Sequence, residues 1–209
     1  MVHLASQSYG KDLVRILRLH RDPSTGKHSI VEYNARCLLS GAQLLTSYTE
    51  GDNSLVVATD SIKNTLNILA KRLPPADVLC PERFCLRVAE HFIGKYSHVE
   101  KVYVDVEVLK WSRISLEGGK GPHKHSFVRD GDDKRVVHLV AGRQGKDAVI
   151  QELQGGLKDL LVLKTTGSEF NGFWRDEYTT LKEVTDRIFS TAIDCKCECS
   201  ASEKSMNPR

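Results

Sequence analysis

The residues most able to do chemistry lie between Gly51 and Thr65, where the apolar run 55–58 leads directly into Thr59 and Asp60. We interpret this run as a strand that delivers a hydroxyl and a carboxylate to the first turn of a helix. Free backbone N–H groups and the positive end of the helix dipole lie at such a turn, so it can bind a small anion. The alternative is that Thr59 or Asp60 only caps the helix, since Thr and Asp are common N-cap residues.

Two other groups of side chains are of metal-ligand type. His123 and His125 alternate along an expected strand, and so do Cys195, Cys197 and Cys199. Alternation places the members of each group on one face of a strand whether or not they bind a metal. Zinc sites normally use a Cys-x2-Cys spacing and a second ligand pair, which neither group has. We therefore expect no metal site.

Five blocks of the sequence, in order, resemble the urate oxidase (uricase) family. They are YGKD at 9–12, DNSLVVATDSIKNT at 52–65, HKHSF at 123–127, LKTT at 163–166 and FWRDEYTTL at 173–181. Five ordered blocks over residues 9 to about 190 are far more specific than one short motif. The resemblance implies oxidation of urate by O2 to 5-hydroxyisourate with release of H2O2, without a metal or organic cofactor. It also implies homotetramers that enclose a tunnel.

The resemblance assigns roles to five residues. Lys11 matches the lysine of the proton relay. Thr59 matches the relay threonine, which also touches O2 and the substrate, and Asp60 matches the position whose backbone N–H contacts the purine. Phe170 matches the aromatic residue that stacks on the purine ring, and Arg187 matches the arginine that binds the urate oxygens. In the family, the Thr and Asp positions come from one subunit and the Phe and Arg positions from its neighbour.

The residue types suit these roles, but each has an ordinary alternative. A lysine acts as a base only where burial or nearby charge lowers its pKa, and Lys11 could equally be a surface lysine. An aromatic face offers contact area to a planar ligand, whereas Phe170 could be a core residue. A guanidinium suits paired acceptors on a flat anion, but Arg187 could form an ion pair with Glu183 or Asp186.

Composition excludes several classes of function. The chain is 40% apolar and 27% charged, which is ordinary for a soluble globular protein. A net charge of +3, with basic residues spread out and no aromatic platform, argues against nucleic-acid binding. No apolar run approaches the roughly 18 residues of a membrane span, and the N-terminus lacks the apolar core of a signal peptide. The six cysteines then indicate reduced thiols inside a cell.

The elements that would position these residues follow from periodicity. Alternation predicts strands at 11–21 and 28–40, and helical spacing predicts helices from 59 or 60 to 73 and from 81 to 96. Further strands are expected at 99–114, 123–129, 136–140 and 187–199, and the segment 150–162 is less clear. The order of the first six elements is strand, strand, helix, helix, strand, strand. This order predicts an α+β unit, in which helices cover one face of an antiparallel sheet. The resemblance makes this the tunnelling fold (T-fold), with two tandem units of which the second is incomplete.

We expect a first T-fold unit at residues 1–134, a partial second unit at 135–199 and a disordered tail at 200–209 that does not resemble the family. The chain has about two-thirds of the family's length. The relay histidine, an asparagine that helps hold O2 and a Val-Gln pair that reads the purine edge have no counterpart. We therefore expect little or no uricase activity from this chain. An alternative is a catalytically impaired product that binds urate or joins full-length subunits.

Two further expectations concern alternatives and location. Another tunnelling-fold purine or pterin enzyme fits less well, since the metal ligands and Glu anchor of such enzymes are missing. Family members usually end in a Ser-Lys-Leu-like peroxisomal address, whereas this chain ends in Met206-Asn207-Pro208-Arg209. The family predicts the peroxisome, and the cytoplasm is the alternative.

Overall fold

The computed structural model describes residues 4–115 and 121–198. Its elements, in chain order, are β1 (Tyr9–Arg21), β2 (His28–Ser40), a 3-10 turn η1 (Ala42–Leu45), α1 (Thr46–Thr49), α2 (Thr59–Arg72), α3 (Pro75–Val78), α4 (Pro81–Lys95), β3 (Lys101–Leu109), β4 (Ser112–Ser115), β5 (Pro122–Val128), β6 (Lys134–Gln144), β7 (Asp147–Lys164) and β8 (Phe189–Glu198). No helix in the described part is long and apolar enough to cross a membrane.

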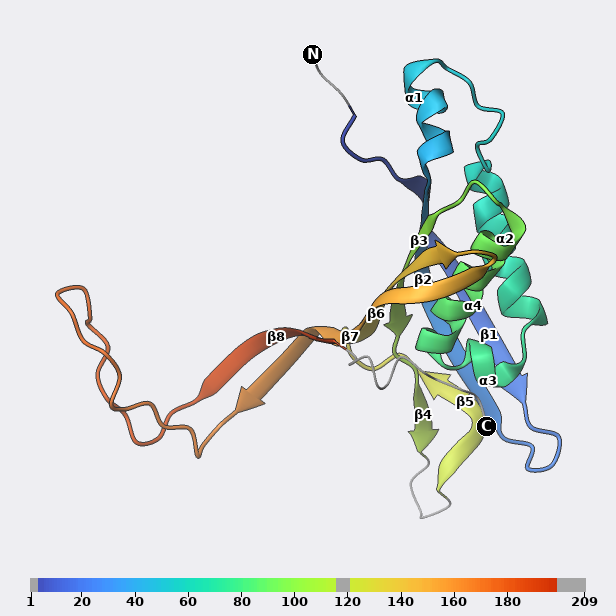
Figure 1. Ribbon diagram of the computed structural model, residues 1–209. Helices are drawn as coiled ribbons and strands as arrows, with labels where there is room; N and C mark the ends of the chain where they lie inside the picture. Colours follow the sequence, from blue (N-terminus) through green and yellow to red (C-terminus); the bar gives the residue numbers. More distant parts are fainter. Residues whose placement is uncertain (1–3, 116–120, 199–209) are drawn as a thin grey trace.

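One antiparallel sheet organises the molecule. Its six strands run in the order β1-β2-β3-β6-β7-β8, and β4 and β5 form a separate hairpin. The helices α2 and α4 cover one face of the sheet, α2 over β1 and α4 over β3 and β6 (Figure 1). This confirms the predicted α+β class and the antiparallel sheet with helices on one face.

The core lies between the sheet and the two helices. Alternate residues of β2 and β3 are buried beneath the helices, as the period-2 pattern predicts. The apolar stripe of α4 packs onto them, and the largest fully buried side chains include Tyr33, Phe84 and Phe92. The hydroxyl of Tyr33 donates a hydrogen bond of 2.5 Å to the carbonyl of Val78, so this buried polar group is satisfied.

A two-stranded arm projects from the body. Residues 147–158 of β7 pair with β6, but from Leu160 onward β7 pairs only with β8. The pairing shifts between Leu157 and Leu160, where Asp159 has a φ of 60°. Residues 165–188 connect the two strands at the far end of the arm (Figure 1). The unclear segment 150–162 is therefore part of a long strand.

Three sequence expectations about elements were wrong. Residues 55–58 are not a strand: the N–H of Val56 closes a turn onto the carbonyl of Asn53, and the N–H of Val57 bonds a side chain. The strand expected at 99–114 breaks after Leu109, where Trp111 turns its indole N–H to Glu32. The segment 123–129 forms a strand, but β6 takes the fourth place of its unit in the main sheet.

The reason for the last correction is burial. Residues Val137, Leu139 and Ala141 of β6 give the sheet an alternating apolar face, whereas β5 is polar and partly exposed. The division of the chain at residue 134 stays a prediction, since the six strands form one sheet across it. Cys199 and the tail 200–209 expected to be disordered lie outside the described residues.

Candidate functional site

The start of α2 is an uncapped helix N-terminus. Its N-cap residue is Ala58, and no side-chain hydrogen bond caps the helix. Thr59 and Asp60 are its first two helical residues, so the alternative in which one of them is the N-cap is wrong. The first backbone bond runs from the N–H of Ile62 to the carbonyl of Ala58. The N–H groups that precede Ile62 in the first turn have no acceptor within the helix, as the anion-binding hypothesis requires.

Lys11 lies close to this turn. Lys63 Nζ donates a hydrogen bond of 2.6 Å to Asp60 and, with its charge, holds the pKa of Asp60 below its usual value; Asn64 and the charge of Lys11 add to this effect. The hydroxyl of Tyr9, two residues before Lys11, accepts a hydrogen bond from the N–H of Val57, two residues before Thr59. This contact brings the segment of the relay candidate Lys11 to the same end of α2 as Thr59 and Asp60.

Tyr9 fastens these two segments together. Its hydroxyl oxygen accepts a hydrogen bond of 2.8 Å from the N–H of Val57, two residues before Thr59. Tyr9 itself lies two residues before Lys11, is half-buried and packs against the core. Burial raises the pKa of the Tyr9 hydroxyl, which therefore stays protonated near neutral pH. The sequence interpretation missed this residue, although it opens the YGKD block.

The backbone around Lys11 is also constrained. A Cβ at Gly10 would lie 1.9 Å from the carbonyl oxygen of Cys37 on β2, so only glycine fits. The register between β1 and β2 shifts between Lys11 and Val14, and Leu13 has a φ of 56°. A bulge of this kind redirects the side chains beside it.

Phe170 and Arg187 meet at the far end of the arm. The guanidinium carbon of Arg187 lies 5.3 Å from the Phe170 ring centroid, within the range of a cation–π contact. Two backbone hydrogen bonds of 3.0 and 3.2 Å join Phe170 to Val184, and the N–H of Arg187 bonds the carbonyl of Ser168 at 2.9 Å. These bonds hold the ring and the guanidinium beside each other across a 17-residue separation in the sequence.

Arg187 has an unused donor. Its Nε is buried and has no hydrogen-bond partner. Among the described residues, Arg187 forms no ion pair with Glu183 or Asp186. Glu183 accepts the N–H of Gly172. Asp186 accepts from the Thr166 hydroxyl and from backbone N–H groups, which lowers its pKa. Phe170 is 40% exposed, so it is not an ordinary core residue. The Phe173 ring stacks on Phe170, with ring centroids 4.7 Å apart. A flat ligand that carries acceptor oxygens can use the exposed part of the Phe170 ring and the unsatisfied guanidinium donor.

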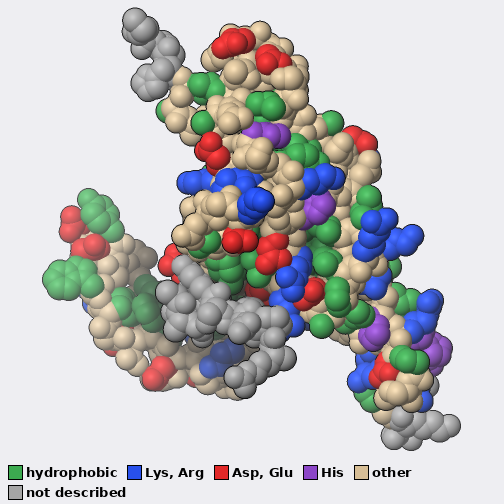
Figure 2. All heavy atoms as spheres, turned by 45° about the vertical axis from the view of Figure 1, so that its right-hand side comes forward, with side chains coloured by type: hydrophobic (Ala, Val, Ile, Leu, Met, Phe, Trp, Pro, Cys, Tyr) green, Lys and Arg blue, Asp and Glu red, His purple; other side chains and the backbone are tan. Residues whose placement is uncertain are grey.

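The two groups do not meet within one chain. The start of α2 belongs to the body, whereas residues 165–188 lie at the end of the arm, well away from α2 (Figure 1). Apolar side chains are exposed on this arm; in Figure 2 it stands apart from the body with apolar side chains at its end. They are Leu161, Leu163, Trp174, Tyr178 and Ile188, each at least 64% exposed.

The side chains of metal-ligand type show no converging set. The His123 and His125 ring centroids lie 4.5 Å apart, and Cys195 and Cys197 are free thiols. Within residues 4–115 and 121–198, no group of three or more His, Cys, Asp or Glu side chains is arranged to hold a metal ion. A cavity of about 810 Å³ lies elsewhere, on the open face of the sheet, and none of the five candidate residues lines it.

Comparison with known proteins gives consistent matches. The uricase family model matches residues 7–140 and 153–208. The chain is 44% identical to a uricase from Emericella nidulans over 93% of its own length and 61% of the relative's, and 46% identical to one from Aspergillus flavus over 89% and 58%. It thus spans about 60% of the length of these relatives. The family match reaches residue 208, so the expectation that the last ten residues do not resemble the family is wrong.

Solved structures agree in fold. A crystal structure of a uricase from Bacillus fastidious superposes with a TM-score of 0.79 at 32% identity, covering 92% of this chain and 65% of the other. A uricase from Arthrobacter globiformis gives a TM-score of 0.78 at 34% identity, covering 95% and 63%.

Proposed function

The chain belongs to the uricase family, and from this premise we propose that it takes part in the oxidation of urate by O2. In this reaction urate, O2 and water yield 5-hydroxyisourate and H2O2, and no metal or organic cofactor is needed. The observation that carries the proposal is the pairing of Phe170 with Arg187, whose buried Nε lacks a partner. A flat anion with ring oxygens is the kind of ligand that completes this arrangement.

Phe170 and Arg187 would bind the substrate. Urate is planar and anionic near neutral pH, so its ring can stack on Phe170 while its oxygens accept hydrogen bonds from the guanidinium. Backbone hydrogen bonds join Phe170 to Val184 and Arg187 to Ser168. They hold the ring and the guanidinium in place before the ligand binds, which lowers the entropy cost of binding.

Lys11, Thr59 and Asp60 would supply the chemistry. A backbone N–H at the uncapped start of α2 binds an anion's oxygen or deprotonated nitrogen. The Thr59 hydroxyl donates and accepts hydrogen bonds, so it can pass a proton from urate or water toward the amine of Lys11. The same hydroxyl would contact O2 beside the ring.

The complete site would form between copies of the chain. The two groups of residues lie apart in one molecule, so a neighbour must bring its arm to the start of α2. Exposed Trp174 and Tyr178, at 88% and 82%, are side chains that an assembly would cover. A homotetramer is the assembly that the family resemblance predicts. Location in peroxisomes stays a prediction.

Mixing two defective variants tests the shared site. Thr59→Val removes one side of the site and Arg187→Ala the other, and each should weaken urate binding, the arginine variant by about tenfold to a hundredfold. If the sides come from different subunits, half of the pairs in a random equal mixture are hybrids with one intact site. The mixture should then recover about a quarter of the wild-type sites. Equilibrium binding of urate after joint refolding measures this fraction.

Matched controls decide the interpretation. Arg175 lies over the Phe173 ring in the same loop, at 5.0 Å, so Arg175→Ala should leave urate affinity nearly unchanged. No recovery in the mixture would refute a site shared between copies, and no urate binding by the wild-type chain would count against the proposed function. Urate loss and H2O2 formation, measured in parallel, test the expectation of low turnover by the 209-residue chain.

A further inference from the structure

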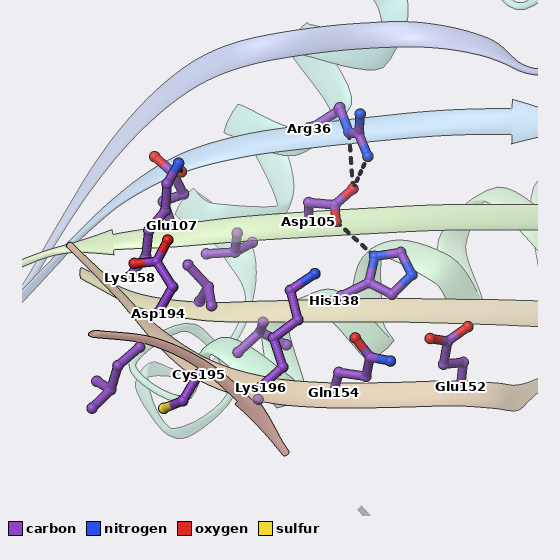
Figure 3. A pocket seen from close by; sticks show the side chains of 15 residues that line it. Arg36, Asp105, Glu107, His138, Glu152, Gln154, Lys158, Asp194, Cys195 and Lys196 are labelled. Atoms are coloured by element: carbon purple, nitrogen blue, oxygen red, sulfur yellow. Dashed lines mark hydrogen bonds and ion pairs between the residues drawn. The ribbon is translucent and has the colours of Figure 1, made fainter. Parts of the chain in front are cut away.

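A cavity lies on the sheet face that the helices leave open. It has a volume of about 810 Å³ and is lined by 15 residues from β2, β3, β6, β7 and β8 (Figure 3). This volume lies within the range of about 300–1,000 Å³ that is usual for small-molecule sites. The cavity is separate from all five residues of the proposed urate site.

Asp105 organises one wall of the cavity. One of its oxygens accepts a hydrogen bond of 2.9 Å from Nε of Arg36 and lies 2.8 Å from Nη2 of the same guanidinium in an ion pair. Its other oxygen lies 2.6 Å from Nδ1 of His138 (Figure 3). A carboxylate at Nδ1 selects the tautomer in which Nδ1 carries the proton, so the neutral ring presents Nε2 as an acceptor. His138 is thereby fixed in both position and tautomer.

Most other charged side chains of the cavity already have an ion pair or a hydrogen bond. Lys158 pairs with Glu107 at 3.0 Å, and Asp194 accepts the backbone N–H of Asp159 at 2.7 Å. Asp194 has no ion pair with a described residue, but this hydrogen bond engages its carboxylate. Lys196 and Glu152 make neither an ion pair nor a side-chain hydrogen bond with any described residue. A lining with one cation and one anion that lack both an ion pair and a hydrogen bond distinguishes ligands by their charge pattern.

The strand register places these two charges on either side of His138. Gln154 of β7 pairs with His138 of β6, so Glu152 is a diagonal neighbour of the histidine. Lys196 of β8 pairs with Gly156, which makes it a diagonal neighbour of Gln154. In Figure 3 the Lys196 side chain extends toward His138 from one side, and the Glu152 carboxylate lies on the other.

The spacing leaves room for a bridging molecule. Glu152 and Gly156, the partner of Lys196, are four residues apart on β7, or about 13 Å. The Lys196 side chain extends toward His138 over part of this distance (Figure 3), so the remaining gap suits a short chain of a few atoms. A ligand with a single charge would be attracted by one of the two groups and repelled by the other.

We propose that this cavity binds a small zwitterion of the amino acid class. Its anionic end meets Lys196, its cationic end meets Glu152, and Nε2 of His138 and the amide of Gln154 make hydrogen bonds between them. The apolar lining residues Val136 and Leu157 contact the connecting methylene groups. This binding site does not depend on urate oxidation.

Three probes of matched length test the charge pattern. The resonances of the His138 ring, assigned by comparison with His138→Gln, are followed by NMR in the full chain during titration with 6-aminohexanoate, hexanoate and hexylammonium. We expect 6-aminohexanoate to shift the His138 signals to saturation, and the singly charged probes to bind at least about tenfold more weakly.

Variants of these two charged side chains complete the test. Glu152→Gln and Lys196→Gln should each weaken 6-aminohexanoate binding about tenfold, whereas Lys101→Gln, on β3 outside the cavity, should have no effect. Equal binding of hexanoate or hexylammonium, wild-type affinity in both charge variants, or no saturable shift with any probe would each overturn the proposal.

Discussion

Replacing Tyr9 by Phe should loosen the entry to α2 without disturbing the sheet. The change keeps the ring against the core but removes the hydroxyl oxygen that accepts the N–H of Val57. Val57 is only 7% exposed, so its amide would lose its partner in a nearly dry place. An unsatisfied buried donor costs about 1–3 kcal/mol. For a chain of this size, 1 kcal/mol corresponds to roughly 2–4 °C in Tm.

Amide hydrogen exchange of Val57 gives the sharpest measurement. If the hydroxyl holds this amide, Tyr9→Phe should speed its exchange by about tenfold to a hundredfold, since 1.4 kcal/mol is a factor of ten. Amides in the middle of β2 should change only by the global loss of stability. Tyr48 is 52% exposed and its hydroxyl makes no hydrogen bond with a described residue, so Tyr48→Phe is the control. Unchanged exchange at Val57 and an unchanged Tm would refute the role assigned to Tyr9.

Further predictions concern the fold. Gly10→Ala should destabilise the protein by about 1–3 kcal/mol in urea unfolding, because a Cβ would lie 1.9 Å from the Cys37 carbonyl oxygen. A Gly10→Ala variant more stable than the wild type would contradict the close approach of β1 and β2. Gly94→Ala in α4 should stabilise the protein by about 0.5–1 kcal/mol, because a Cβ there would meet nothing within 4 Å. Phe92→Ala should cost about 3–5 kcal/mol, since the ring is fully buried, and a loss below about 1 kcal/mol would show that α4 does not pack there. Burial raises the pKa of Glu32, but the hydrogen bonds of Arg15 and Trp111 and the charge of Arg129 outweigh it and leave that pKa lowered. This contribution to stability is complete above the unfolded pKa of about 4.3 and is lost as pH falls through the lower folded value, so urea midpoints between pH 7 and pH 3 should fall less in Glu32→Gln than in the wild type.

Local patterns in the sequence specified most of the elements. The alternation from Val31 to Leu39 predicts β2 with its buried face, and the apolar stripe from Phe84 to Phe92 predicts α4. Both predictions succeed because the period of a strand or helix is a local property of the sequence, and the apolar face that it creates is the face that packs into the core. The apolar run 55–58 was wrongly predicted to be a strand because it is too short to show a period. Val57 is buried without a strand partner, and four apolar residues do not distinguish a strand from a turn that leads into a helix.

In the candidate site, too, the sequence predicted some features and missed others. The five candidate residues were assigned by resemblance, and their roles stay predictions. Sequence alone could not place Arg187 against Phe170, because backbone pairing of Phe170 with Val184 produces that contact. It also could not single out Tyr9, since its partner Val57 is 48 residues away.

The sequence by itself determined the α+β class, the position of most strands and helices and membership of the uricase family. Only the tertiary structure decided that β6 rather than β5 joins β3, that the two parts of the proposed urate site lie apart in one chain, and that Asp105 orients His138 beside a charged cavity. The physical reason is that periodicity and motifs depend on residues that are close in the sequence. Strand order and contacts between distant side chains depend instead on which apolar faces the whole chain can bury together.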